Sequence, residues 1–414
     1  MNVIDLFAGA GGLSEGFRQA DFDIRAHVEM DRDACLTLKT REVYHYLNSI
    51  NRLDIYERYL RNEITRDELY SQVPEEIIHK VINAEISDET IDDVFDKLDP
   101  LLNNEHVHLI IGGPPCQAYS LAGRSRDPEN MENDPRNYLY RQYIRFIRRY
   151  QPDYFVFENV KGILSAKNGT IFADIQREMH ESGYNIDYRI LNAKDFGVLQ
   201  NRKRVIIIGA RFGIDFDYPD FDIEETHSTI RDLFSDLPNI CSGESYDPRD
   251  GYAGQPNQYL IDCGIRVPDW NVLSQHESRP NQERDLKIYR RCVNVWNSEH
   301  RKVKYNELPE ELQTHKNTET FLDRFNVVPY DDVSHTIVAH ISKDGHYFIH
   351  PDINQNRSIS IREAARVQSF PDTYYFESCR TAAFKQIGNA VPPLMAKIIA
   401  IWLKEQLNQI AIIH

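Results

Sequence analysis

Short apolar runs alternate with helical stretches over the first half of the chain. The runs are rich in Val, Ile, Leu and Phe and are bounded by Gly, Pro or Asn, which is typical of buried strands. The predicted strands are Asn2–Phe7, Ile24–Val28, Leu109–Ile111, Tyr154–Phe157 and Val205–Ile208. The predicted helices include residues 13–20, Tyr138–Tyr150 and Ile171–Glu181. This alternation predicts an α/β domain, a parallel sheet covered by helices on both faces, with ligands at the carboxyl ends of the strands.

The pattern changes after Gly213. Residues 213–357 are irregular and rich in Pro, Asn, Asp and Tyr, with short strands predicted at His335–Ile341 and His346–Ile349. Helical patterning returns from Ser360, and residues 391–407 predict an apolar helix. The predicted division is a first domain at 1–212 with a helical insertion near 45–80, a second, smaller domain at 213–376, and a segment at 377–414 that returns to the first domain.

Composition limits the class of protein. Hydrophobic residues make up 41% of the chain and charged residues 27%, which suits a folded protein. No apolar run reaches the roughly 20 residues of a membrane helix, and the first residues do not resemble a secretory signal. We therefore expect a cytoplasmic protein with no membrane partner. None of the six cysteines forms a Cys-x-x-Cys pair, so no metal site is expected.

The net charge of −16 argues at first against a nucleic-acid partner. The acidic excess is, however, local. Residues 41–105 carry 16 acidic and seven basic residues, and residues 213–250 carry 11 and two. Because these two segments contain more than the whole excess, a basic cleft elsewhere on the protein is compatible with the composition.

The first predicted strand runs into a glycine-rich turn, Ala8-Gly9-Ala10-Gly11-Gly12. Glycines there let a ligand approach the backbone closely. The dinucleotide fingerprint G-x-G-x-x-G fails, since its third glycine would fall on Ser14. Glu29 ends the next strand, where a carboxylate can accept hydrogen bonds from ribose hydroxyls. A nucleoside without a pyrophosphate is therefore favoured, and a tight turn without a ligand is the alternative.

Two further strand ends carry reactive side chains. Pro114 and Pro115 fix the backbone before Cys116, whose thiol is either a nucleophile or an inert buried group. Glu158 follows the strand Tyr154–Phe157, and a carboxyl group at the edge of an apolar pocket can donate a proton near neutral pH. A helix cap or an ion-pair partner is its alternative role.

Arg202 and Arg204 lie in an extended run and are expected on the same side. Two guanidinium groups there suit a phosphate, a base oxygen or a carboxylate. A solvated basic strand end is the alternative.

Six segments in this order resemble the C5-cytosine DNA methyltransferase family. The resemblance covers roughly residues 1–40, 82–211 and 358–400. The segments are Asp5 to Gly12, Gly113-Pro114-Pro115-Cys116-Gln117, Phe157-Glu158-Asn159-Val160, Gln200-Asn201-Arg202-Lys203-Arg204, Arg362 to Pro371, and Gln386-Ile387-Gly388-Asn389-Ala390-Val391-Pro392. Each segment alone is weak, but their shared order is specific. The resemblance implies a Rossmann-like S-adenosylmethionine-dependent methyltransferase domain with a smaller target-recognition domain at 213–376.

The resemblance also implies roles for the catalytic candidates. Cys116 would add to carbon 6 of cytosine, and Glu158 would hold or protonate ring nitrogen 3. Arg204 would bind the base oxygen and steady Glu158, and Arg202 would hold a phosphate. The positions that match the family's cofactor site are Phe7, Gly9, Ala10, Gly12, Glu29, Met30, Pro115, Leu139, Asn389 and Val391. Glu85 and Ile86 are the nearest match to an Asp-Ile pair that recognises adenine.

DNA contacts are implied in two places. Residues 117–137, with Ser120, Arg124 and Arg126, resemble the family's catalytic loop, which closes over a base flipped out of the duplex. Thr336 resembles a residue near the phosphate of the flipped nucleotide. The loop departs from the family pattern at Asn137, where Gly is usual, and this change would stiffen the end of the loop.

The implied enzyme transfers a methyl group from S-adenosylmethionine to cytosine in a specific duplex DNA sequence, within a bacterial restriction-modification system. We expect a monomer, and a cognate restriction endonuclease need not bind it. Two alternatives stay open. One is a tRNA cytosine-5 methyltransferase, which the long second domain disfavours. The other is a non-catalytic DNA-binding regulator, which the intact set of Cys116, Glu158, Arg202 and Arg204 disfavours.

Overall fold

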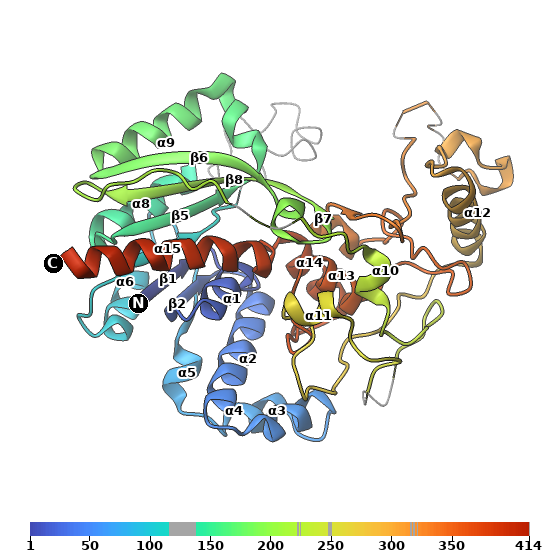
Figure 1. Ribbon diagram of the computed structural model, residues 1–414, viewed down its shortest axis with the longest axis horizontal. Helices are drawn as coiled ribbons and strands as arrows, with labels where there is room; N and C mark the ends of the chain where they lie inside the picture. The colour runs from blue at the N-terminus through green and yellow to red at the C-terminus, as the bar shows by residue number, and fades with distance from the viewer. Residues whose placement is uncertain are drawn as a thin grey trace.

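A computed structural model gives the fold. It describes residues 1–115, 138–221, 223, 225–246, 251–314, 317, 319–320 and 322–413. The chain forms a wide sheet flanked by helices, joined to a region of short helices and long irregular segments (Figure 1).

Seven strands form the central sheet, in the order β3-β2-β1-β4-β5-β8-β6. Their bounds are β1 Asn2–Leu6, β2 Asp23–Glu29, β3 Val81–Asn83, β4 Leu109–Gly112, β5 Tyr154–Asn159, β6 Tyr184–Asn192 and β8 Lys203–Arg211. All five strands predicted for the first half of the chain are present. The sheet is not wholly parallel, because β8 runs antiparallel to both β5 and β6. The connection from β6 to β8 spans only residues 193–202, and a parallel crossover needs about a dozen residues or more.

Strand β6 has no counterpart among the strands predicted from the sequence. This strand lies at the edge of the sheet and most of its side chains are partly or fully exposed. It therefore lacks the apolar run that marks the central strands. Its neighbour β8 is buried along most of its length and was predicted in part.

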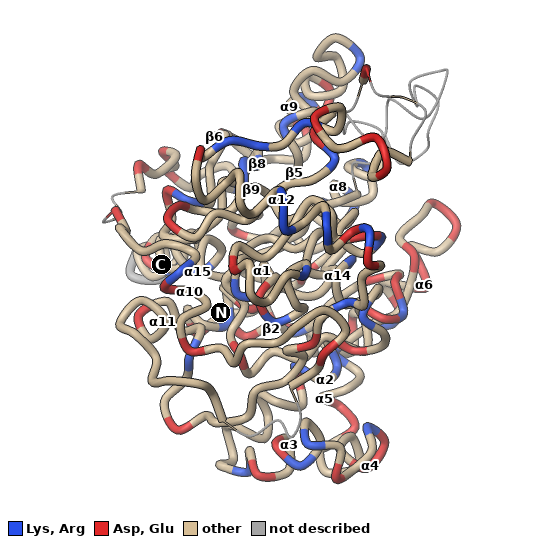
Figure 2. Tube along the Cα trace, turned by 90° about the vertical axis from the view of Figure 1, so that its right-hand side faces the viewer, with Lys and Arg blue, Asp and Glu red and all other residues tan. Residues whose placement is uncertain are grey.

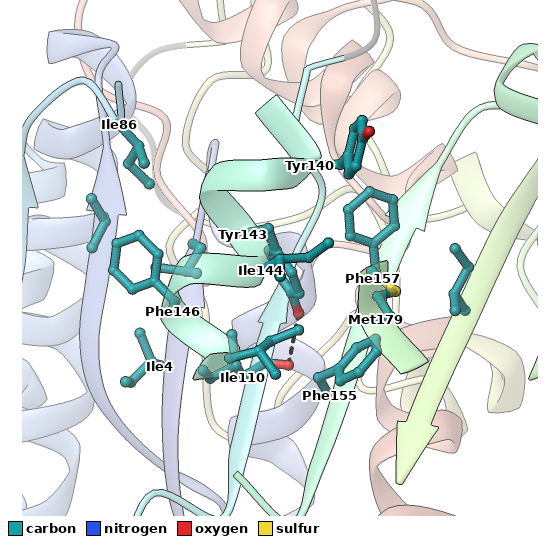
Figure 3. Close-up of a cluster of buried hydrophobic side chains, with 14 of the residues drawn as sticks. Ile4, Ile86, Ile110, Tyr140, Tyr143, Ile144, Phe146, Phe155, Phe157 and Met179 are labelled. Atoms are coloured by element: carbon teal, nitrogen blue, oxygen red, sulfur yellow. Dashed lines mark hydrogen bonds between the residues drawn. The ribbon is translucent and has the colours of Figure 1, made fainter. Parts of the chain in front are cut away.

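Alternate strand residues build two cores, one on each face of the sheet. On one face Ile110, Phe155 and Phe157 pack against α6, α8 and α9 (Figure 3). On the other face their neighbours Ile111 and Val156 pack against α1 and α15. The helices are α1 Gly12–Gln19, α6 Ile91–Leu102, α8 Leu139–Tyr150, α9 Thr170–Glu181 and α15 Pro393–Ile413. This period of two is the pattern of a sheet buried on both sides, as predicted.

The segment near residues 45–80 is helical, as predicted. It comprises the end of α2 Arg32–Ser49, then α3 Leu53–Leu60, α4 Arg66–Tyr70 and α5 Glu75–His79. Its apolar side chains pack with Trp270 and Val272 of the later region. The Tyr56 hydroxyl donates a 3.0 Å hydrogen bond to the carbonyl of Thr373. These helices therefore support distant parts of the chain.

Residues after 213 form short elements. They are α10 Ile230–Phe234, α11 Gln258–Asp262, α13 Ile361–Val367 and α14 Arg380–Asn389, the longer α12 Glu283–Glu299, and the 3-10 helices η5 Tyr305–Glu307, η6 Glu310–Leu312 and η7 Ala339–Ser342. Two further 3-10 helices, η3 Lys161–Gly169 and η4 Ala193–Phe196, lie earlier in the chain, after β5 and β6. Here the strand predictions were largely wrong. Only β9 (Ser334–His335) forms, paired with β7 (Gln200–Asn201), and η7 follows it. Ile349 makes isolated bridges only. The division at 212 and 376 stays a prediction.

Two buried ionic clusters hold the irregular region together. Arg366 pairs with Asp236 and Asp372, both at 2.6 Å, and all three side chains are fully buried. Arg357 pairs with Glu363 at 2.6 Å. Such pairs fix geometry because breaking one leaves an uncompensated buried charge.

Among the described helices, none is by itself long and apolar enough to cross a membrane, although α14 and α15 together, bent by 41°, pass that test.

Candidate active site

Three central strands end at the same level of the sheet. The last residues of β1 and β4 are paired, and Gly112 of β4 is paired with Phe157 of β5. The residues that follow, Phe7, Gly113 and Glu158, therefore lie together at the carboxyl edge. The strand order reverses between β1 and β4, which is where ligands of open α/β sheets bind.

Glu158 and Arg204 form an ion pair at this edge. Oε1 of Glu158 lies 2.8 Å from Nε of Arg204, and the two side chains are 13% and 14% exposed. The reversed course of β8 makes the pair, because it brings the start of β8 to the end of β5. The absence of a side chain at Gly113 makes room, since a Cβ there would lie 2.7 Å from Oε2 of Glu158. The carboxylate is thus fixed in orientation while still reachable from solvent.

Asn159 anchors the segment that leads to Cys116. Its side-chain amide donates a 3.3 Å hydrogen bond to the carbonyl of Pro114, and its Oδ1 accepts one of 2.9 Å from the amide of Val160. Asn159 is buried. Asn159 belongs to the Phe157-Glu158-Asn159-Val160 motif, but no role for its side chain was predicted. The structure shows that it ties the Glu158 strand to the residues before the cysteine.

The glycine turn is shaped for a close ligand. Phe7 and Gly9 have φ values of +53° and +54°, and an added Cβ on Gly9 would meet nothing within 4 Å. Oε2 of Glu29 accepts a 2.8 Å hydrogen bond from the amide of Gly9, and Oε1 accepts one of 2.8 Å from Asp31. Burial raises the pKa of Glu29, against these backbone hydrogen bonds. Each oxygen keeps a lone pair for a hydroxyl donor.

The later Gly-Asn-Ala-Val motif lies against this turn. An added Cβ on Gly12 would come within 2.1 Å of the carbonyl oxygen of Val391. Val391 and Ala10 are buried, whereas Asn389 is exposed at the end of α14. The structure therefore brings the first and last predicted cofactor segments together, although more than 370 residues separate them.

The phosphate role expected for Arg202 is contradicted. The side chain is fully buried, and its guanidinium donates to the carbonyls of Ile337 at 2.7 Å, Gly388 at 3.2 Å and Ala390 at 2.8 Å. Burial lowers its pKa well below the usual value. A guanidinium enclosed by three main-chain carbonyls cannot reach a phosphate. Arg202 instead joins the β7–β8 segment to the segment at Ile337 and to the end of α14 at Gly388 and Ala390.

A network of buried charges lies beneath the glycine turn, and the sequence analysis missed it. His27 lies between Asp5 and Glu42, each at 3.2 Å. Arg41 pairs with Glu15 at 2.7 Å, and the Tyr374 hydroxyl donates to the carbonyl of Ala10. These residues come from separate strands and helices, so no local pattern marks them. Only the presence of polar residues in otherwise apolar elements hinted at them.

The comparisons with known proteins identify the family. The chain matches the C-5 cytosine-specific DNA methylase family over residues 1–65 and 56–405. It is 43% identical to the Type II methyltransferase M.Bpa9945I of Bacillus paralicheniformis, covering 99% of both chains. The chain belongs to this family. It is also 31% identical to the Type II methyltransferase M.DdeI of Desulfomicrobium norvegicum, covering 99% of this chain and 91% of that one. A crystal structure from E. coli, described as a prophage-encoded DNA modification methyltransferase, shares the fold with a TM-score of 0.63 at 24% identity, over 99% of both chains.

The remaining candidate residues of this DNA (cytosine-5-)-methyltransferase fall into three groups. Cys116, Ser120, Arg124 and Arg126 lie outside the described residues. Thr336 donates a 2.6 Å hydrogen bond to the carbonyl of Asn201, next to the Arg202–Arg204 run. The others lie around the carboxyl edge with different exposure: Ile86 is buried, Leu139 is half-buried, and Met30, Glu85 and Pro115 are exposed. No group of three metal-ligating side chains occurs within the described part of the chain.

Proposed function

We propose that this enzyme methylates carbon 5 of cytosine within a specific duplex DNA sequence, as part of a restriction-modification system. The observation that carries the proposal is the Glu158–Arg204 pair, which lies beside the Asn159-anchored segment that leads to Cys116. The relatives named as Type II methyltransferases support DNA as the substrate and a restriction-modification context.

S-adenosylmethionine is the proposed cofactor, and the glycine turn fits it. The open space at Gly9 admits a ligand close to the backbone, and Glu29 offers acceptors to ribose hydroxyls. No third glycine is available for a pyrophosphate, since Ser14 occupies that position. When bound, S-adenosylmethionine supplies an electrophilic methyl group.

The residues of the chain supply the rest of the chemistry. Carbon 5 of cytosine is a poor nucleophile until a thiolate adds to carbon 6, which is the role proposed for Cys116. Glu158, held by Arg204, holds or protonates ring nitrogen 3 so that the ring can accept the thiolate. Arg204 also contacts the base oxygen. After methyl transfer a base removes the carbon 5 proton and Cys116 leaves. Because the ring faces are stacked in a duplex, the base must first be flipped out.

The decisive experiment combines a trap with sequencing. DNA with 5-fluorocytosine at the target should form an adduct that survives denaturing electrophoresis and maps to Cys116, because fluorine cannot leave as a cation. Bisulfite sequencing of DNA from expressing cells should reveal one methylated sequence. The variant C116A should lose both signals and keep cofactor binding. Full methylation of DNA by C116A would overturn the proposal, and methylation of tRNA but not of duplex DNA would redirect it.

The variant E158Q tests the second role. An amide cannot deliver the proton to nitrogen 3, so we expect turnover to fall by about a hundredfold or more, in the range of general acid–base effects. The change is nearly isosteric and the carboxylate is partly exposed, so thermal stability should stay close to that of the wild type. Unchanged turnover would remove Glu158 from the mechanism.

The region at 213–376 is the proposed reader of DNA sequence. Base edges in the major groove are distinguished by side chains, and this long irregular region carries many. Exchanging it for the same region of a relative should change the methylated sequence and retain the chemistry. An active chimera that keeps the original target would place recognition elsewhere.

A further inference from the structure

An open groove of about 480 Å³ lies at the end of the sheet where its last two strands, β8 and β6, are paired. Its walls come from the residues after β5, from the end of β6 with η4, and from the start of β8. Three of its lining residues are Lys161, Lys194 and Lys203, all exposed. Lys203 directly precedes Arg204, and Lys161 lies three residues after Glu158. The groove is therefore built from chain segments adjoining the catalytic pair, although Lys203 and Arg204, as consecutive strand residues, point to opposite faces.

The charge of this groove is unusual for the protein. Within the described residues the three lysines make no ion pair, and the single carboxylate on the groove wall is that of Asp195. The chain as a whole carries a net charge of −16, yet three of the seven residues that line this groove are lysines. Figure 2 shows Lys and Arg positions along β6 and β8, in the upper part of the view. Unpaired ammonium groups that share one groove repel one another, and a bound polyanion would relieve that repulsion.

A buried amide on the groove wall is also left without a complete set of partners. Asn192 is 7% exposed, and its amide nitrogen donates a 3.0 Å hydrogen bond to Oδ1 of Asn201. Its own Oδ1 has no hydrogen-bond partner among the described residues. This free Oδ1 is itself buried, so a ligand in the groove could reach it only after the Asn192 side chain rotates. Ile190, 44% exposed on the same wall, adds an apolar contact for a sugar.

The groove is tied to the region proposed to read DNA. The carbonyl of Asn201 accepts the 2.6 Å hydrogen bond from Thr336, and β7 pairs with β9 at this point. A ligand in the groove would thus touch elements that connect directly to both the catalytic pair and residues 213–376. This favours a long polyanion over a single phosphate group, because only a long ligand can contact the groove and these neighbouring elements at the same time.

We propose that this groove binds the sugar-phosphate backbone of a DNA strand beside the target cytosine, with Lys161, Lys194 and Lys203 as the phosphate contacts. The inference rests on the proposed function, which it deepens by assigning substrate-binding residues. It also replaces the phosphate role that the sequence suggested for Arg202. Lysine suits this role because its ammonium group is a compact point charge.

The test compares two triple variants that remove equal charge. In the groove variant Lys161, Lys194 and Lys203 become Gln. In the matched control Arg58, Lys97 and Lys404, which lie on α3, α6 and α15, become Gln. Dissociation constants for a duplex that carries the target sequence are measured by fluorescence anisotropy at several salt concentrations. Each lost phosphate contact should lower the slope of log affinity against log salt by about 0.9, so we expect the groove variant to lose about 2–3 and to bind at least tenfold more weakly.

The control variant should keep the wild-type slope and turnover. In the groove variant KM for DNA should rise more than kcat falls, and cofactor affinity and melting temperature should match the wild type. Equal slopes in the groove variant and the wild type would overturn the inference, as would an equal loss in both triple variants. Displacement of DNA by inorganic phosphate, but not by chloride of equal ionic strength, would show a free-phosphate site instead. If the wild type itself neither binds nor methylates duplex DNA, the proposed function fails first.

Discussion

Arg202 offers the clearest contrast between what its sequence motif implies and what the structure shows. Replacing it with Met keeps most of the side-chain volume and removes the guanidinium. The carbonyls of Ile337 and Gly388 then lose their bond from this side chain, while that of Ala390 keeps a 3.3 Å bond from the Gln368 amide. An unsatisfied buried acceptor costs about 1–3 kcal/mol. Removing the guanidinium also removes the desolvation cost of a buried cation, which offsets part of this loss. We therefore expect the free energy of unfolding of R202M to fall by about 2–4 kcal/mol.

The matched variant is R204M, two residues along the same run. Arg204 pairs with Glu158, and both side chains keep some access to water, so its loss should cost less than that of Arg202, about 1–2 kcal/mol, between the values for exposed and buried pairs. Turnover should respond in the opposite order. R204M should lower kcat by about a hundredfold or more, as the loss of one positioned charge typically does. Thermal melting and single-turnover methylation of both variants therefore separate a structural arginine from one at the active site.

A third variant, R202K, tests whether the charge or the shape of the guanidinium matters. R202K keeps the positive charge, but one ammonium group cannot span three carbonyls, so it should melt nearly as low as R202M. A phosphate ligand would behave differently. R202M would then fold normally, and the slope of log affinity for DNA against log salt would fall by about one unit. R202K would restore most of the binding. That pattern would refute the structural role and return Arg202 to the DNA interface.

Three further predictions concern the glycine turn, the cysteine segment and pH. G12A should abolish cofactor binding and destabilise the fold, because its Cβ would meet the Val391 carbonyl oxygen at 2.1 Å, whereas G9A should fold with a loss of about 1 kcal/mol and show only the binding defect; calorimetry and melting check both. N159A should lower kcat and spare cofactor affinity, and equal kinetics in N159A and wild type would contradict the anchoring role. Burial lowers the pKa of several histidines, so below pH 6.5 the unfolded chain binds protons that the folded chain does not bind, and the free energy of unfolding should fall from pH 6.5 toward pH 4 by at most about 1.4 kcal/mol per pH unit for each of them. The largest shifts are those of His45, His276 and His335, each with a pKa of about 4, and His350, with a pKa of about 3. Denaturant midpoints that stay level from pH 7 to pH 5 would contradict this.

His27 has the opposite sign. Burial lowers its pKa, but hydrogen bonds and charges from Asp5 and Glu42 outweigh burial and raise the pKa above the ordinary value. A raised pKa stabilises the folded state fully below pH 6.5, and this contribution is lost as the pH rises through the folded pKa. The stability of H27Q relative to the wild type should therefore improve toward alkaline pH.

The strand ends could be predicted from the sequence because their signals are local. The run before Glu158 and the turn after β1 are read from neighbouring residues, and both lie where the sequence analysis put them. The edge strand β6 and the segment His335–Ile341 could not be read in this way. One is partly exposed and lacks an apolar run, and the other is fixed by contacts with β7 and α14 rather than by its own pattern.

The same distinction explains why a family motif does not by itself assign a chemical role. Gln200 and Arg202 belong to the same short segment as Arg204, yet they face the protein interior. Gln200 donates to the carbonyl of Val367 at 3.1 Å and accepts from the amide of Ile337 at 2.8 Å. Arg202 adds its three carbonyl contacts to the same region. Both side chains fasten the strand that carries Arg204, and only Arg204 reaches the catalytic carboxylate. Precise positioning of the active site therefore restricts the buried neighbours, such as Gln200 and Arg202, as strictly as the reacting side chains. The burial of a motif residue is what distinguishes a positioning role from a chemical one.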